Sequence, residues 1–284
     1  MEKIILLVIC QDKSGIIASV TNFIAANSGN IVYIDQHVDR ENSLFFMRLE
    51  SEFESDDFHY ESFKQNFEAQ IVPKFQMKWR LYNSDSKPRM AIFVSKYDHC
   101  LYDILSRHAS SEWHAEIPFI LSNHEELAHI AKNFNIPFYH VPISKDSKSE
   151  ATELQMALLR KHEVDCIVLA RYMQIIPKEL IDDYPNKIIN IHHSFLPAFV
   201  GAKPYHSAYK RGVKIIGATS HYVTEELDAG PIIAQDVAHV SHTHAVKDLI
   251  AKGRDLEKIV LSNAVKMHLE RKVIVHGNKT IVFS

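Results

Sequence analysis

Residues 187–192 read Lys-Ile-Ile-Asn-Ile-His, a short apolar run that ends in polar residues. Its β-branched isoleucines favour a strand, in which successive side chains point to opposite faces. Asn190 and His192 are two positions apart, so we expect both to project from one face near the carboxyl end of that strand. A polar pair at this place costs stability unless it is hydrogen-bonded or used, and the spacing alone fits a structural pair as well as a functional one.

Apolar runs and helical patterns alternate along the chain before this stretch. The strand-like runs are 90–94, 117–121, 138–141 and 166–170, and the helical segments lie around 99–110, 124–134 and 147–162. After the stretch, residues 245–270 have the pattern of one long helix, and 273–275 and 280–283 that of two short closing strands. The alternation predicts an α/β fold with a doubly wound, mainly parallel sheet, whose ligands bind outside the carboxyl ends of the strands.

Residues 83–88 read Asn-Ser-Asp-Ser-Lys-Pro, a polar segment with no apolar period. Such composition is typical of a linker between domains. We therefore expect a first domain over 1–83, a linker over 84–88 and a second domain over 89–284.

The first domain has the pattern β-α-β-β-α-β. The expected strands are 4–10, 30–38, 43–49 and 75–81, with one helix between Gly15 and Gly29 and another over 57–71. This order is a split βαβ, ferredoxin-like arrangement. Together with the turn into the first helix it resembles the ACT domains, which bind amino acids and regulate enzymes. That turn consists of Asp12, Lys13, Ser14, Gly15 and Ile16.

The ACT resemblance implies that the turn binds a small effector such as glycine or methionine. It also implies that subunits pair through their sheets into a homo-oligomer. A purely structural or assembly role of this domain fits the same residues.

The composition points to an ordinary globular protein with a small-molecule partner. The 284 residues include 32 basic and 35 acidic ones, and the net charge of -3 gives no electrostatic reason to expect a nucleic acid or an anionic membrane. The three cysteines are odd in number and widely spaced, which suggests a reducing compartment, the cytoplasm. The apolar run 4–10 is too short to cross a bilayer.

The 18 histidines raise the question of a metal site. His192 and His193 are adjacent, and on a strand they would face opposite ways. His242 and His244 have no carboxylate or cysteine nearby in the sequence, so we expect no functional metal. A dinucleotide site is not indicated either, because no G-x-G-x-x-G follows a strand, and we expect no permanently bound cofactor.

Two blocks of sequence closely resemble the folate-dependent formyltransferase family. The first is 190–197, Asn-Ile-His-His-Ser-Phe-Leu-Pro, followed by 201–206, Gly-Ala-Lys-Pro-Tyr-His. The second is 217–223, Gly-Ala-Thr-Ser-His-Tyr-Val, which leads to 227–233, Leu-Asp-Ala-Gly-Pro-Ile-Ile. The resemblance covers nearly all of residues 88–284, and the double histidine and the continuation 198–203 are similar to the deformylase branch.

This resemblance implies that Asn190, His192 and Asp228 form a catalytic set for 10-formyltetrahydrofolate. Without it, an Asp before Ala229 and Gly230 is more often a turn former. Asn190 and His192 would donate to the oxyanion that forms when the formyl carbonyl is attacked. Asp228 would hold His192 and act as general base, and we expect partial burial to raise the pKa of this carboxyl.

The resemblance also assigns a folate-binding segment, whose backbone amides and carbonyls bind the pterin. Met173 and Ile176 would be apolar walls, although both fit plain core positions as well. Several relatives have an arginine where this chain has Gln174, so no particular side-chain role is expected there. The implied folate-binding residues are Arg171, Tyr172, Met173, Gln174, Ile175, Ile176 and His221.

The acceptor of the formyl group follows from what the chain does not contain. The loop 95–100, Ser-Lys-Tyr-Asp-His-Cys, lacks the glycine with which glycinamide ribonucleotide transformylases hold a phosphate. We expect no further tRNA-binding or aldehyde dehydrogenase domain in a chain of this length. The prediction is hydrolysis to formate and tetrahydrofolate, which supplies formate for one-carbon metabolism and purine biosynthesis. The alternatives are formyl transfer to an amine of the glycinamide ribonucleotide type, and a non-catalytic amino-acid sensor.

Overall fold

The computed structural model describes residues 1–54, 58–144, 146–197 and 204–284. Its contacts divide the chain into two compact units. The first comprises Met1–Lys87, Arg271–His276 and Ile281–Ser284, and the second comprises Pro88–Glu270 and Gly277–Thr280. The expected second domain, 89–284, differs from this division at its C-terminal end. The reason is that Ile274 and Phe283 are buried against Ile5, Leu7 and Phe46 of the first unit.

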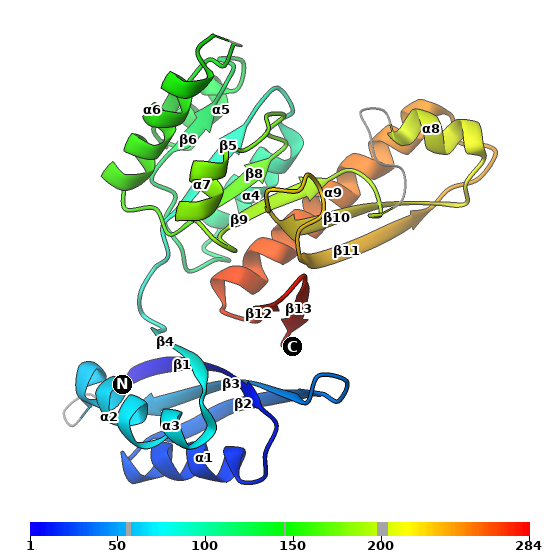
Figure 1. The fold of residues 1–284 in the computed structure, drawn as a ribbon. Coiled ribbons are helices and arrows are strands. Elements are labelled where there is room, and N and C mark those ends of the chain that lie inside the picture. The colour runs from blue at the N-terminus through cyan, green and yellow to red at the C-terminus, as the bar shows by residue number, and fades with distance from the viewer. Residues whose placement is uncertain (55–57, 145, 198–203) are drawn as a thin grey trace. The chain divides into compact units, whose positions relative to one another are not determined.

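The first unit has the expected ferredoxin-like order of elements (Figure 1). Its elements are β1 (Glu2–Gln11), α1 (Ile16–Ala26), β2 (Asn30–Asp39), β3 (Leu44–Phe53), α2 (Tyr60–Gln70), α3 (Val72–Phe75) and β4 (Lys78–Asn83). The antiparallel sheet has the order β2-β3-β1-β4. The last strand begins later than expected, because residues 72–75 form a helical turn and Gln76 is left-handed. Phe75 and Met77 are nevertheless buried, which explains their apolar pattern.

The second unit contains a seven-stranded sheet. Its strands are β5 (Met90–Val94), β6 (Ile120–Ser122), β7 (Phe138–His140), β8 (Cys166–Ala170), β9 (Ile188–His192), β10 (Ile215–Tyr222) and β11 (Ile232–His239). The order is β11-β10-β9-β8-β5-β6-β7, with parallel pairing from β9 to β7 and antiparallel pairing of β10 with β9 and β11. The prediction of a mainly parallel sheet is confirmed. The antiparallel strands β10 and β11 at one edge of the sheet were not predicted.

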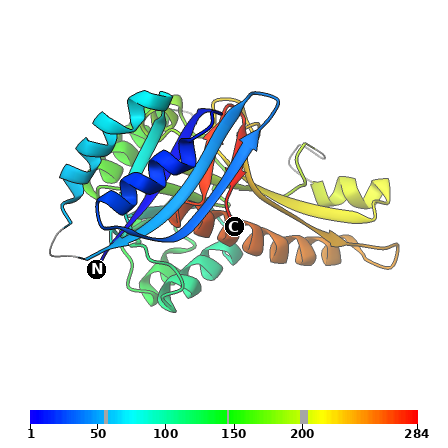
Figure 2. The same ribbon diagram turned by 90° about the horizontal axis from the view of Figure 1, so that it is seen from below.

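Helices cover both faces of this sheet (Figures 1 and 2). They are α4 (His99–Ala109), α5 (Ala128–Asn133), α6 (Lys148–Lys161), α7 (Lys178–Asp183), α8 (Pro204–Arg211) and α9 (Val246–Leu269). On one face, Ala91 and Phe93 of β5 pack in a core with Leu159 of α6 and Leu180 of α7. On the other, α4 and α9 lie against each other and α9 runs along β9 to β11. Burial on both faces explains why β5 and β8 are continuous apolar runs.

The order of the strands places the ends of β5, β8 and β9 side by side. The chain leaves β5 toward β6 and β7, and then returns to form β8 and β9 on the opposite side of β5. The carboxyl ends of strands at such a reversal enclose the crevice where α/β sheets bind ligands. Ser95, Arg171 and His193 follow directly after these three strands.

Two short strands close the chain, β12 (Val273–His276) and β13 (Lys279–Val282), and they pair with each other. Among the helices that the structure describes, none is long and apolar enough to cross a membrane.

Candidate active site

A cavity of about 330 Å³ lies at the carboxyl ends of β8 and β9. All three residues predicted from the sequence to be catalytic line this cavity. The seven residues predicted to bind folate line it as well. The part of the family signature at 198–203 lies outside the described residues. These ten residues come from four separate stretches of the chain, and the fold brings them together around one cavity.

Asp228 contacts His192 within this cavity. Asp228 Oδ1 lies 3.2 Å from His192 Nδ1, and the two side chains are 15% and 8% exposed. Asp228 has a φ of 55°, a left-handed conformation that aspartate tolerates better than most residues. Two residues later, a Cβ on Gly230 would lie 1.8 Å from the carbonyl oxygen of Tyr222, so only glycine fits the turn that presents Asp228.

The expectation that burial would raise the pKa of Asp228 is wrong. The neighbouring imidazoles, His192 first and then His221, hold the pKa of this carboxyl well below its usual range and outweigh its partial burial. Asp228 is therefore a stable carboxylate at neutral pH and a weak base by itself. Its geometry fits the role of holding His192 with Nδ1–H directed at the carboxylate.

Asn190 is oriented by the neighbouring strand. His221 on β10 lies opposite Asn190 on β9, and Asn190 Nδ2 donates to His221 Nε2 at 3.2 Å. His221 in turn donates from Nδ1 to the carbonyl oxygen of Tyr222 at 2.9 Å. These two bonds fix which way the Asn190 amide faces, and they leave its second N–H available to a ligand.

The loop after β8 is anchored from two sides. The Ser95 hydroxyl accepts a hydrogen bond from the backbone N–H of Met173 at 2.9 Å, and Gln155 donates to the Tyr172 hydroxyl at 3.1 Å. Ile176 is buried and has the character of a core residue, whereas Met173 and Ile175 are 52% and 67% exposed at the cavity. Exposed apolar side chains at a cavity are typical of a binding wall for a flat ring.

The side chain of Arg171 points into the protein rather than toward the folate-binding wall. Arg171 is buried with a φ of 64°, and its guanidinium donates to His193 Nδ1 at 2.8 Å. It also lies over the ring of Tyr97, 5.0 Å from the centroid. Arg171 belongs to the predicted segment, but its guanidinium contacts His193 and Tyr97 inside the protein.

His193 is a cavity residue that the sequence reasoning missed. Adjacent histidines were expected to face opposite ways, yet the rings of His192 and His193 are 5.1 Å apart and both line the cavity. Strand alternation does not apply, because β9 ends at His192. Burial, and after it the charge of Arg171, lowers the pKa of His193 to about 4. The feature of the sequence that could have indicated His193 is its position immediately after a parallel strand.

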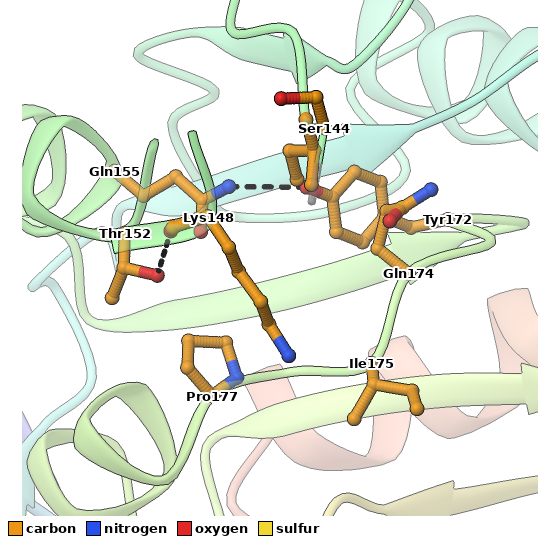
Figure 3. Close-up of a pocket in the computed structure, with 9 residues that line it drawn as sticks. Ser144, Lys148, Thr152, Gln155, Tyr172, Gln174, Ile175 and Pro177 are labelled. Atoms are coloured by element: carbon orange, nitrogen blue, oxygen red, sulfur yellow. Dashed lines mark hydrogen bonds between the residues drawn. The ribbon is translucent and has the colours of Figure 1, made fainter. Parts of the chain in front are cut away.

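A second cavity, of about 320 Å³, is lined by residues of α6 and of the loop after β8 (Figure 3). The two share Tyr172, Gln174 and Ile175. Lys148 of α6 extends along this second cavity, and no ion pair joins it to another described residue. The two cavities therefore have walls in common, and the second carries one positive charge at Lys148.

One group of His, Cys and acidic side chains in the described ranges is close enough to hold a metal ion. It consists of His99, Cys100 and Glu257, whose ligand atoms lie within 4.8 Å of one another. Glu257 already accepts hydrogen bonds from His99 at 2.8 Å and from Tyr205 at 2.7 Å, and Arg171 Nε lies 3.4 Å away. A cationic neighbour and occupied acceptor oxygens favour an internal network over a metal centre.

Comparison with known proteins identifies the family. Residues 88–265 match the family model for formyl transferase, and residues 4–58 match that for the ACT domain. The formyltetrahydrofolate deformylase of Synechocystis sp. is 50% identical over 281 residues, which cover 98% of this chain and 98% of the relative. The crystal structure of a formyltetrahydrofolate deformylase from Pseudomonas syringae pv. tomato is 46% identical, with a TM-score of 0.96 over 100% of this chain and 95% of that one.

A phosphoribosylglycinamide formyltransferase from Anaplasma phagocytophilum is also similar, at 30% identity and a TM-score of 0.64. That match covers 70% of this chain and 96% of the relative, so it leaves part of the present chain unmatched, whereas the deformylases match nearly all of it. The chain belongs to the formyltetrahydrofolate deformylase family, and it carries an ACT domain ahead of its formyl transferase domain.

Proposed function

We propose that this protein hydrolyses 10-formyltetrahydrofolate to tetrahydrofolate and formate, and so supplies formate for one-carbon metabolism and purine biosynthesis. The observation that carries the proposal is the contact of His192 with Asp228 beside Asn190 in one cavity, in a chain of the deformylase family. The substrate is a folate, and no further cofactor takes part in the steps below.

The reaction needs a proton acceptor for water and a donor for the oxyanion. Water adds to the formyl carbon, the carbonyl electron pair moves to oxygen, and the water proton passes to His192 Nε2. The Asp228 carboxylate stabilises the imidazolium that results, as in other histidine–aspartate pairs. The oxyanion is stabilised by Asn190, whose amide is held in place by His221.

Collapse of the tetrahedral intermediate completes the turnover. The carbon–N10 bond breaks, its electron pair goes to N10, and His192 returns its proton to that nitrogen. Formic acid then loses a proton to become formate. The balance is one water consumed and one proton released, and the catalytic groups return to their starting states.

The two adjoining cavities support a binding mode in which one folate spans both. The pterin and the formyl-bearing N10 beside it would lie in the catalytic cavity against the exposed side chains of Met173 and Leu227. The benzoyl-glutamate part would cross Ile175 into the second cavity, where Lys148 would face the carboxylates (Figure 3). Shared walls at Tyr172, Gln174 and Ile175 support a single ligand that spans both cavities.

The loop after β5 favours water over a phosphorylated amine as acceptor. Lys96 is paired with Glu126 at 3.1 Å, and His99 at the start of α4 is bonded to Glu257. Both basic groups of this loop are thus engaged with acidic side chains of the protein itself. The test is turnover of 10-formyltetrahydrofolate with and without glycinamide ribonucleotide: equal rates support hydrolysis, and a rate that requires the amine refutes it.

The ACT domain supports regulation by an amino acid such as glycine or methionine. In the turn into α1, Asp12, Lys13 and Ser14 are exposed, and Gly15 has a φ of 88° with no atom near a Cβ position. We expect the amino acid to bind there and to change the hydrolysis rate, with Gly15→Val removing the response. An effect that persists in this variant would place the effector elsewhere.

Assembly and compartment belong to the same proposal. The edge strand β2 exposes Val32 and Ile34, which fits pairing of two subunits into a homo-oligomer through their sheets. The three cysteines of the chain are free thiols, which fits the cytoplasm. Sedimentation equilibrium of the wild type and of Val32→Lys tests the first point.

A further inference from the structure

A chain of buried polar contacts connects α9 to the catalytic cavity. Glu257 is 1% exposed and accepts hydrogen bonds from His99 and Tyr205. Arg171 Nε lies 3.4 Å from Glu257 Oε2, and the other end of the guanidinium donates to His193 at 2.8 Å. Burying this many polar groups costs free energy that apolar packing would avoid.

The backbone of α9 is built to admit this network. A Cβ on Gly253, one turn before Glu257, would lie 2.1 Å from the Tyr205 hydroxyl and 2.2 Å from its ring. Glycine inside a helix costs roughly 1 kcal/mol relative to alanine. Its presence here leaves room for Tyr205 to reach the carboxylate, which fixes Glu257 for its contact with Arg171.

The contact with Arg171 determines which ring nitrogen of His193 carries the proton. A guanidinium only donates, so His193 Nδ1 must accept, and the proton of the neutral ring resides on Nε2. His193 lines the cavity beside His192, and no described residue accepts a hydrogen bond from this N–H, so it can serve a ligand there. A neutral donor keeps the same protonation state while His192 gains and loses its proton.

We propose that His193 is a catalytic residue whose Nε2–H donates to the oxygen that becomes negative when water adds to the formyl group, and that Glu257, through Arg171, is the positioning residue for it. The proposal rests on the proposed hydrolysis. It gives the oxyanion a second donor beside Asn190 and leaves His192 free to carry the proton of water. Preorganised neutral donors of this kind are each worth about 10²-fold or more in rate.

Two variants of His193 separate a donor from a structural ring. In His193→Gln the side-chain amide can place an N–H where Nε2 was, whereas in His193→Asn the shorter amide can accept from Arg171 but cannot reach the substrate. We expect kcat to fall about 100-fold in His193→Asn and less than about tenfold in His193→Gln, with KM nearly unchanged in both. Equal kcat values in the two variants would overturn the donor role.

The same assay distinguishes this inference from the proposed function. If the wild type releases no formate, hydrolysis itself is refuted and the inference fails with it; if the wild type is active and the two variants are alike, the inference alone fails. A measurement on the wild type guards against misfolded variants. Selective ¹⁵N-histidine spectra should show His193, assigned by its loss in the variants, as a neutral Nε2–H tautomer from about pH 6 to 8. A charged or Nδ1–H ring would contradict the inference.

Glu257→Gln tests the positioning step. We expect kcat to fall about tenfold with little change in KM, and the ¹⁵N spectrum to show both neutral tautomers of His193, because Arg171 loses its anionic partner. Ser262→Ala is the matched control, since Ser262 is buried on the same helix but its hydroxyl bonds only to carbonyls of Lys258 and Ile259. An unchanged kcat and tautomer in Glu257→Gln would show that the network is merely structural.

Discussion

Asp228 approaches His192 from a left-handed turn, with its Oδ1 atom 3.2 Å from His192 Nδ1. The two residues are 36 positions apart in sequence and meet because β10 pairs antiparallel with β9 and the chain turns back after β10. The carboxylate thereby holds the Nδ1 edge of the His192 ring.

Replacing Asp228 by Asn should abolish most of the activity. The amide keeps the shape of the side chain but removes the charge that stabilises the imidazolium and holds the histidine tautomer. We expect kcat to fall about 10⁴-fold, the loss found when a triad carboxylate is neutralised. Formate release measures it, and circular dichroism checks that the variant is folded. A variant with wild-type kcat would remove Asp228 from the mechanism.

The same carboxylate should make stability depend on pH in a defined window. Its folded-state pKa is lowered, so its stabilising contribution is complete above the unfolded value of about 3.9 and is lost as pH falls toward the folded value. The difference in unfolding free energy between the wild type and Asp228→Asn should therefore be constant from neutral pH to about pH 5 and shrink below about pH 4. Urea unfolding at several pH values measures it, and a difference that grows on acidification would contradict the assignment.

Gly230→Ala should disrupt both fold and activity. The new Cβ would meet the carbonyl oxygen of Tyr222 at 1.8 Å, so the turn that presents Asp228 must move. We expect a loss of about 2 to 4 kcal/mol in unfolding free energy and a large loss of kcat. The control is Gly212→Ala, where φ is 69° but no atom lies within 4 Å of the Cβ position. It should cost roughly 1 kcal/mol and leave kcat unchanged.

Lys148→Ala should weaken binding of the substrate tail. If Lys148 faces the glutamyl carboxylates, KM should rise severalfold for substrates with several glutamates and less for a single glutamate, with kcat unaffected. Lys132→Ala on α5, which lines neither cavity, is the matched control. An equal KM for Lys148→Ala and wild type at low ionic strength would place the tail elsewhere.

The sequence predicts the parts of this molecule that depend on local pattern. Apolar runs bounded by turns revealed β5, β8 and β9, because strands buried on both faces leave a continuous signal. The spacing of Asn190 and His192 put them on one face, and they do line one cavity. Asp228 joined them through the family resemblance, since no local rule states where a turn residue lies in three dimensions.

Features that depend on contacts between distant segments could not be predicted from the sequence. The lowered pKa of Asp228 follows from two imidazoles on other strands, so its burial alone gave the wrong direction. The role of Arg171 follows from Glu257, 86 positions further on. The C-terminal strands were assigned to the second domain because they follow α9 in the chain, whereas Ile274 and Phe283 are buried in the first unit.

The most direct test of the central claim is turnover of 10-formyltetrahydrofolate in ¹⁸O-labelled water without any amine, by the wild type and by Asp228→Asn. Hydrolysis predicts one mole of formate per mole of tetrahydrofolate, with one ¹⁸O atom in each newly formed formate, and almost no product from the folded variant. Tetrahydrofolate that appears only when glycinamide ribonucleotide is added, with the formyl group on that amine, would contradict the account.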